Sequence, residues 1–220
     1  MDWTAAWLTF RLAAATALIL LLVGLPLAYW LATTRWRGRF LVEAVVALPV
    51  VLPPTVLGFY LLLALGPRGP VGRAVQSLTG QSLPFTFAAI LIGSVLFNLP
   101  FAVRPFTAAF AAVDRRLVEA SWCLGVSRLA TFWRVTLPLS WAGVLTGIVL
   151  SFAHTVGEFG VVLMLGGNRP GVTRTVSVVI YDEVQAMNYA AAHATALALV
   201  GFSFAVLCVT YALQRRVLPL

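Results

Sequence analysis

Side chains that could carry out chemistry are few in this sequence, and they do not group into a catalytic pattern. His154 and His193 have no cysteine or third ligand at metal-binding spacing, so we expect both to be packed and hydrogen-bonded. No Ser–His–Asp order, catalytic carboxylate pair or phosphate-binding loop can be recognised. All 15 basic residues are arginine, so the lysine that a Walker A loop uses to hold nucleotide phosphates is missing. The sequence predicts a protein that is not an enzyme, with no catalytic residue, metal or cofactor.

Glu158 is the only acid in the apolar stretch from Leu139 to Leu165. A carboxylate inside a membrane is costly and usually faces protein or water, so such a residue is a candidate for function. We favour a structural role, in which Glu158 pairs with an arginine or caps a helix break at Gly157 and Gly160. A gating role is the alternative that the sequence leaves open.

A polar segment interrupts the apolar sequence between Asp114 and Val135. Its apolar side chains are mixed with arginines and one glutamate, Glu119, which suits one or two short amphipathic helices outside the bilayer. Gly125 is expected to form the turn between them, because glycine accepts left-handed backbone angles. Pro138 is expected to end the second helix and to begin the next span. A solvated hairpin on the lipid surface is the alternative.

The composition predicts that the chain lies in a membrane. Of the 220 residues, 61% are hydrophobic and only 10% are charged, with a mean hydropathy of +0.96. Soluble domains have about 25% charged residues, so this chain could not cover a water-facing surface. Its formal charge of +8 comes from few residues, and we interpret it as membrane topology rather than nucleic-acid binding.

Five apolar stretches are long enough to cross a bilayer, which needs about 20 residues of helix. They are Trp7–Leu31, Phe40–Leu65, Thr86–Val103, Leu139–Leu165 and Ala191–Leu213. The second contains Pro49, Pro53 and Pro54, so it should be kinked or broken. The sequence thus predicts an all-α polytopic membrane protein with about five transmembrane helices in a single domain, 1–220. A sixth short span is the alternative.

The arginines indicate the orientation of these spans. One side would hold Arg35, Arg37, Arg39, Arg104, Arg115, Arg116, Arg128, Arg134, Arg215 and Arg216, and the other Arg68, Arg73, Arg169 and Arg174. The richer side faces the cytoplasm. We therefore expect the N-terminus outside, the C-terminus in the cytoplasm, and a long cytoplasmic loop over residues 104–138. The first span has no basic residue before Arg11, so we expect it to be retained, and Glu43 should pair with the nearby arginines.

The polar segment resembles the cytoplasmic loop of the permease subunits of ABC importers. That family's pattern is Glu-Ala-Ala, three residues, Gly, nine residues, Ile, one residue and Leu-Pro. The matching positions here are Glu119, Ala120, Ser121, Gly125, Val135, Leu137 and Pro138, with Ser for the third Ala position and Val for Ile. The resemblance implies a type I ABC importer permease fold whose loop docks as a coupling helix onto a cytoplasmic ATPase. In that arrangement Glu119 contacts a basic residue of the ATPase.

Two further stretches resemble the permeases of molybdate importers, with sulfate and tungstate permeases as close relatives. They are LPVVLPPTVLGFYLLLALGPRGPVG at 48–72 and HTVGEFGVVLMLGGNRPGVTRT at 154–175. Arg169 departs from the resemblance, because an apolar residue is expected before Pro170. The resemblance implies that a tetrahedral oxyanion is the substrate.

The second of these stretches offers candidates for the substrate path. Backbone N–H groups of Gly166, Gly167 and Asn168 could approach an anion. A simple turn or a docking site for a binding protein is the favoured alternative, in which Arg169 and Arg174 would meet an acidic partner. Gly157 and Glu158 are further candidates, although a carboxylate on the path would repel the substrate.

Together these features predict the transmembrane permease subunit of an ATP-driven molybdate importer in the bacterial plasma (inner) membrane. The expected partners are a cytoplasmic ATP-binding subunit that hydrolyses ATP, a periplasmic or extracytoplasmic oxyanion-binding protein, a second copy of the chain, and the lipid bilayer, with no nucleic acid. A sulfate or tungstate ABC permease is one alternative, and a motor-independent anion channel or secondary carrier is another. A carrier has no need for a docking loop and usually has broken helices in both halves, whereas this sequence shows one proline-broken span.

Overall fold

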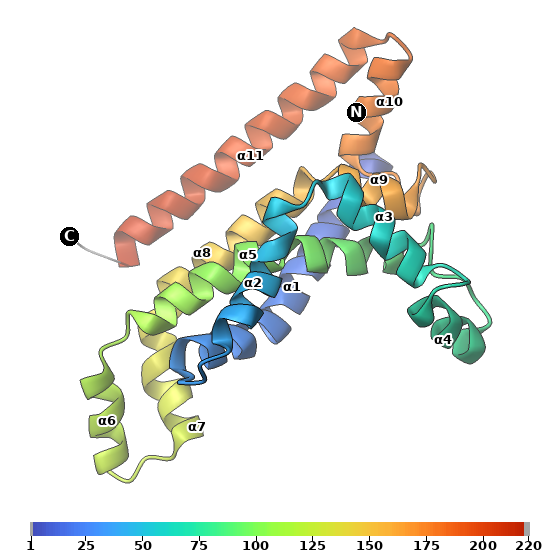
Figure 1. The fold of residues 1–220 in the computed structure, drawn as a ribbon. Helices are drawn as coiled ribbons and strands as arrows, with labels where there is room; N and C mark the ends of the chain where they lie inside the picture. The colour runs from blue at the N-terminus through green and yellow to red at the C-terminus, as the bar shows by residue number, and fades with distance from the viewer. Residues whose placement is uncertain (1, 218–220) are drawn as a thin grey trace.

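Helices account for all of the regular secondary structure in residues 2–217, which are the residues that the computed structural model describes (Figure 1). In chain order they are α1 (Trp3–Thr33), α2 (Arg39–Val51), α3 (Pro54–Leu65), α4 (Pro70–Thr79), α5 (Phe87–Ala111), α6 (Arg115–Cys123), α7 (Arg128–Thr131), a π-helical turn (Phe132–Thr136), α8 (Leu137–Val156), α9 (Gly160–Gly166), α10 (Val176–Gln185) and α11 (Tyr189–Val217). The predicted all-α class is confirmed.

Four helices in the described part of the chain are long and apolar enough to cross a membrane. They are α1, α5, the continuous helix Arg128–Val156, and the Tyr189–Thr210 part of α11. The pair α2 and α3 adds a fifth if it is counted as one span, but its two halves are bent by 112°. This agrees with the predicted number of about five spans. The sides on which the termini lie remain a prediction, and the side chains of Arg215 and Arg216 lie outside the described residues.

The break between α2 and α3 lies where the prolines predict it. Leu52 has extended backbone angles, as is usual for a residue before proline, and Pro53 and Pro54 cannot donate backbone hydrogen bonds. Pro54 occupies the first position of α3, where a missing N–H costs nothing. Near the start of α2, Arg39 and Glu43 form the predicted local ion pair, with 3.7 Å between Nε and Oε1. Both side chains are exposed, so this pair contributes little to stability.

The predicted polar loop over 104–138 is shorter in the structure, because helices enter it from both sides. α5 continues past Val103 to Ala111. Pro138 does not end a helix, because α7, the π-helical turn and α8 form one continuous helix. The Leu137 N–H bonds to the carbonyl oxygen of Phe132, five residues back. This wide turn accommodates the proline ring that would clash in a regular α-helix.

The predicted fourth span is divided by a second break. α8 ends at Val156, and the chain is not helical again until Gly160. A span over Leu139–Leu165 was therefore too long, whereas the break considered at Gly157 and Gly160 is present. A Cβ atom on Gly160 would lie only 2.8 Å from the Cβ of Pro54. The two broken spans thus meet, and α3 packs closely on α9.

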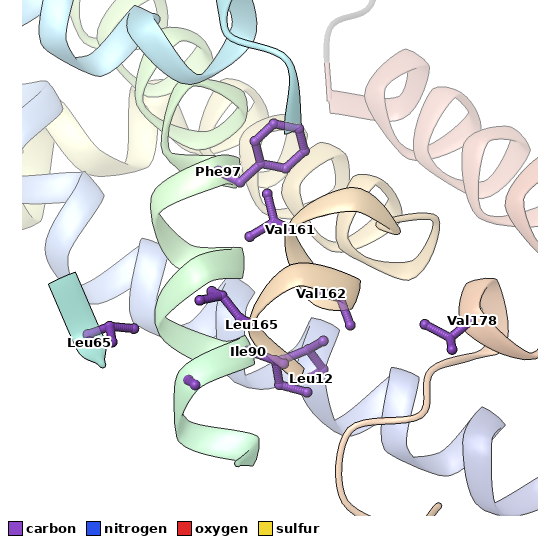
Figure 2. Close-up of a cluster of buried hydrophobic side chains, with 9 residues drawn as sticks. Leu12, Leu65, Ile90, Phe97, Val161, Val162, Leu165 and Val178 are labelled. Carbon is purple, nitrogen blue, oxygen red and sulfur yellow. The ribbon is translucent and has the colours of Figure 1, made fainter. Parts of the chain in front are cut away.

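α5 lies at the centre of the helices and packs against α1 and α8. Two apolar clusters form along it. One contains Leu12, Leu65, Ala89, Ile90, Phe97, Val161, Val162, Leu165 and Val178. Figure 2 shows this cluster gathering side chains from α1, α3, α5, α9 and α10. The other contains Leu20, Ala28, Leu31, Val46, Ala102, Val103, Phe106, Phe110 and Val144.

Two helices lie apart from this central group. α4 projects to one side (Figure 1), and the sequence analysis did not predict it. Pro70 at its first turn and Gly80 in the left-handed conformation after its end are the signals that could have found it. α11 leans away from the other helices and contacts mainly α10 and α8 (Figure 1). Exposed apolar side chains therefore cover much of α11, among them Leu197, Val200, Phe202, Phe204 and Val209.

Two buried glycines lie beside Phe106, and replacing each by alanine should have a different effect on the free energy of unfolding. A Cβ on Gly147 would lie 2.5 Å from a ring carbon of Phe106, whereas a Cβ on Gly24 would lie 3.4 Å from Val103. Gly147→Ala should lower the free energy of unfolding by about 1–3 kcal/mol, the cost of overpacking. Gly24→Ala should leave it unchanged or raise it by up to about 1 kcal/mol. Thermal unfolding in detergent, followed by circular dichroism, measures both, and equal midpoints would contradict the packing described.

Candidate functional site

Residues 115–131, called the loop helices below, form a helix–turn–helix between α5 and α8. Asp114 caps α6, because its Oδ1 accepts from the Arg116 N–H at 2.9 Å. At the other end, the Gly125 N–H bonds to Trp122 O and the Val126 N–H to Ser121 O. Gly125 has a φ of +78° between these bonds, which is the Schellman arrangement of a helix end. The predicted pair of short helices with a turn at Gly125 is therefore present.

A buried hydrogen bond joins the two loop helices. Ser121 Oγ lies 2.9 Å from Thr131 Oγ1, and both side chains are buried. Ser127 starts α7 by accepting from the Ala130 N–H at 3.3 Å. Serine at the third position of the Glu-Ala-Ala pattern thus has a local reason, because alanine could not bond to Thr131.

The loop helices present an unpaired acid among exposed apolar side chains. Glu119 and Ala120 are exposed, and no ion pair within the described residues involves Glu119. Leu124 is 83% exposed and Leu129 is 70% exposed. Figure 1 shows α6 and α7 projecting beyond the ends of the longer helices. Exposed apolar groups gathered around a polar residue are typical of a protein–protein contact surface.

The structure separates the remaining residues of the pattern from this surface. Val135 lies in the π-helical turn, and Leu137 and Pro138 begin α8. Leu137 packs against the apolar cluster around Phe106. These three residues therefore belong to the stem that connects the loop helices to the membrane.

Glu158 is the centre of a second candidate region, the polar cluster of Ser94, Asn98, His154 and Glu158. The side chain of Glu158 is only 4% exposed. Its Oε2 accepts from Asn98 Nδ2 at 3.0 Å, and its Oε1 has no hydrogen-bond partner among the described residues. No arginine among the described residues pairs with it, so of the two structural roles considered, pairing with an arginine is not found there. The partner is an amide from α5 instead, and Glu158 lies at the helix break.

Asn98 holds this cluster together. Its Nδ2 donates to Ser94 O at 2.8 Å as well as to Glu158. Its Oδ1 must then be the acceptor for His154, whose Nδ1 lies 2.8 Å away and carries the proton. The His154 ring also stacks on Phe101, with 3.9 Å between ring centroids. Asn98 is not among the residues predicted from the sequence, although it is the only amide or acid within Thr86–Val103.

The two histidines differ in their surroundings. His154 is packed and hydrogen-bonded as predicted, whereas His193 is exposed on α11, which contradicts the expectation for that residue. Among the described residues, no three His, Cys, Asp or Glu side chains come together in a way that could hold a metal ion.

Contacts within the chain organise the loop of residues 166–175, which joins α9 to α10. Asn168 Nδ2 donates to Asp182 Oδ2 at 2.6 Å, and Arg174 Nη2 lies 3.1 Å from the same oxygen. Asp182 is therefore a partly buried anchor of this loop. The Gly167 N–H bonds to Leu163 O, at a φ of +61°. This N–H is thus used within the chain, which favours the turn over an anion cradle.

Two other residues of this loop also have structural partners. A Cβ on Gly166 would lie 2.6 Å from Ile90 Cγ2, so close packing requires glycine there. Arg169 Nη1 donates to Phe85 O at 2.7 Å, while the rest of its side chain is exposed. This bond gives a reason for arginine before Pro170.

Known proteins with similar sequences are membrane transport components. Residues 24–219 match the family described as binding-protein-dependent transport system inner membrane component. The molybdenum transport system permease protein ModB of Azotobacter vinelandii is 52% identical over 214 residues, which cover 97% of this chain and 95% of that protein. ModB of Escherichia coli K12 is 33% identical over 184 residues, which cover 84% of this chain and 80% of that protein.

Solved structures share the fold at low sequence identity. A bacterial ABC transporter that imports alginate has a TM-score of 0.79 and 18% identity, covering 97% of this chain and 78% of that one. The MetNI methionine ABC transporter, in an inward-facing conformation, has a TM-score of 0.73 and 17% identity, covering 97% and 94%. At this identity the likeness concerns the fold alone, and it confirms the predicted permease fold.

Gly125 gives a prediction about the shape of the loop helices. Gly125→Val places a β-branched residue at positive φ, which costs about 1–2 kcal/mol or more, whereas Gly125→Asn should be tolerated. No atom lies within 4 Å of a Cβ added at Gly125, so the two variants differ in backbone strain rather than in packing. Trypsin should cleave the purified Val variant faster at Arg116 and Arg128. Leu124→Val is the control for added branching at an ordinary φ, and equal cleavage of the Val and Asn variants would contradict the prediction.

Asn98 and Glu158 should be energetically coupled. Asn98→Leu leaves the carboxyl of Glu158 and Nδ1 of His154 without their partner, and each unpaired buried group costs about 1–3 kcal/mol. Adding Glu158→Met removes the unpaired acid and should restore part of the stability, with a coupling energy of about 0.5–3 kcal/mol. The free energies of unfolding of the wild type, both single variants and the double variant measure this coupling. Additive effects would show that the 3.0 Å bond contributes nothing.

Proposed function

Because the chain belongs to the family of binding-protein-dependent transport system inner membrane components, we propose that it is the transmembrane permease subunit of an ATP-driven molybdate importer. The observation that carries this proposal is the loop-helix surface, on which Glu119 has no ion-pair partner within the described chain and apolar side chains are exposed. The 52% identity to a molybdenum permease over nearly the whole chain supports the choice of substrate.

The loop helices dock onto a cytoplasmic ATPase in this proposal. Glu119 pairs there with a basic residue of the ATPase, and such charge-assisted bonds are among the stronger hydrogen bonds in proteins. Ala120 is small and exposed, so the partner's backbone can approach closely. Gly125 and the Ser121–Thr131 bond hold the surface in one shape before binding. ATP-driven closure of the ATPase moves the loop helices, and the spans follow as rigid bodies.

The working unit is a homodimer with the substrate path along its two-fold axis. Support comes from α11, which leans away from the other helices and exposes apolar side chains along its length. A second copy of the chain would cover part of this surface, and lipid the rest. The orientation follows from the arginines, with the loop helices in the cytoplasm and the loop of residues 166–175 on the opposite side.

Molybdate is delivered to the outer side by a binding protein. Arg169 is the better candidate for contact with that protein, because Arg174 is already paired with Asp182. Gly157 is exposed at the break after α8 and is a candidate for the substrate path. Glu158 has a structural role beside it, since its carboxyl is directed to Asn98 and would repel an oxyanion. A sulfate or tungstate permease is the alternative for the substrate.

One structural feature supports the alternative function, a secondary carrier, more strongly than the sequence does. Secondary carriers use broken helices near the membrane midplane, and the described residues contain a second helix break, between Val156 and Gly160, besides the break between α2 and α3. The loop helices still favour the ATP-driven importer, because a carrier without a motor gains nothing from an exposed apolar docking surface.

Uptake of radiolabelled molybdate at low nanomolar concentration tests the proposal. Cells with the chain should accumulate the label, and cells without it should not. Glu119→Ala should reduce uptake tenfold or more, because removing one partner of a desolvated charge pair costs about 2–5 kcal/mol. Glu43→Ala is the matched control, since Glu43 is also an exposed glutamate but pairs with Arg39 of the same chain. It should leave uptake unchanged.

Competitors separate the substrates in the same assay. Unlabelled tungstate should compete with molybdate, and excess sulfate should not. Uptake erased by modest sulfate would move the assignment to a sulfate permease. Wild-type uptake by Glu119→Ala would contradict the docking role of Glu119, and uptake that does not depend on the chain would contradict oxyanion import.

A further inference from the structure

A large cleft lies beside the loop helices, and the function proposed above uses only Glu119 and Leu129 of its lining and assigns it no occupant. Its volume is about 1260 Å³, and the C-terminal part of α1, the end of α5, the loop helices and the start of α8 line it. Small-molecule sites usually measure about 300–1,000 Å³, so this cleft is suited to something larger than a small solute.

The floor of the cleft is apolar. Leu21, Leu22 and Leu25 of α1 face it from one side, and Leu137 and Val144 of α8 from the other. Leu22 is largely exposed although it lies within a membrane-spanning helix. This surface suits a hydrocarbon chain that runs along α1.

The rim of the cleft is basic. Arg35, Arg39, Arg115 and Arg128 line it, and Glu119 is the one acid among the lining residues. Arg39 is paired with Glu43, and Arg128 lies over the ring of Trp122 at 5.6 Å. Arg35 and Arg115 are exposed, and no ion pair within the described residues involves either of them. Two guanidinium groups are therefore available, and guanidinium binds phosphate oxygens in pairs.

Three tryptophans also line this cleft. Trp122, Trp133 and Trp141 all line it, and all three are exposed. Tryptophan is enriched where lipid head groups meet the hydrocarbon. The lining of the cleft thus combines free arginines, exposed tryptophans and an apolar floor, which are the groups that a phospholipid would meet.

We propose that this cleft binds one anionic phospholipid, with its phosphate at Arg35 and Arg115 and an acyl chain along Leu21, Leu22 and Leu25. The proposal rests on the proposed function only for the cytoplasmic side of the loop helices, where the leaflet is rich in anionic lipid. The bound lipid fills the space between α1 and the loop helices and holds them at a fixed distance.

Native mass spectrometry of the purified full chain tests the proposal, with phosphatidylglycerol and phosphatidylcholine as probes. The chain should retain one phosphatidylglycerol in preference to phosphatidylcholine. The double variant Arg35→Gln, Arg115→Gln should bind phosphatidylglycerol roughly thirty-fold more weakly, from the loss of two basic groups near the head group. Arg35→Lys with Arg115→Lys keeps both charges and should retain most of the preference, which separates loss of charge from loss of fold.

Arg68→Gln with Arg73→Gln is the matched control, because these exposed arginines lie outside the cleft. It should bind like the wild type. Equal binding of the two lipids would overturn the proposal, and so would unchanged lipid binding by the double variant Arg35→Gln, Arg115→Gln. If that double variant keeps its lipid but no longer co-purifies with an ATPase, the proposal is also overturned, and the cleft is assigned to the ATPase. The assay uses neither molybdate nor ATP, so a failure of the uptake prediction leaves its result unaffected.

Discussion

Backbone groups released by a helix break must find partners inside the protein, because hydrocarbon offers none. This chain has two such breaks, one before Pro53 and Pro54 and one at Gly157–Phe159. The two breaks pack against each other, because α3 and α9 approach at distances that only glycine permits. A Cβ on Gly58 would lie 2.7 Å from Met164 Cβ, and a Cβ on Gly160 would lie 2.8 Å from Pro54 Cβ. The polar cluster closes the same region, where Asn98 of α5 bonds to Glu158 in the second break. The arrangement of α1, α5 and α8 around this region follows from the need to keep it covered.

The sequence predicts features that depend on local chemistry, and it misses those that depend on packing. The number of spans follows from the lengths of the apolar stretches. The first break follows from the missing N–H groups of the adjacent prolines. The turn at Gly125 follows from the position of that glycine in the loop pattern. The sequence offers the second break, at Gly157 and Gly160, only as one possibility, because Gly157 resembles Gly143 and Gly147, which remain helical in the same run. Asn98 and Glu158 are 60 residues apart, and only the packing of α5 on α8 brings them together. The path through Pro138 depends on a wide turn that no residue type signals by itself.

Two departures from the family pattern have explanations within the chain. Serine at position 121 replaces a small apolar residue, and it bonds to Thr131 across the loop helices. Arginine at position 169 replaces an apolar residue, and it bonds to the carbonyl oxygen of Phe85 before α5. In both cases a side-chain hydrogen bond ties a loop to a neighbouring segment. These substitutions therefore stiffen connections between elements, and neither one introduces a reactive group.

The wide turn at Phe132–Thr136 gives the molecule a mechanical property. Because the chain passes through it without a joint, Arg128–Val156 is one rod of 29 residues, about 44 Å long at about 1.5 Å per residue. The loop helices sit at one end of this rod, and the break beside Glu158 begins at the other. A displacement at Arg128 would be carried along one continuous helix as far as Val156. The helical hydrogen bonding of this segment ends there, beside the buried side chains of Asn98, His154 and Glu158.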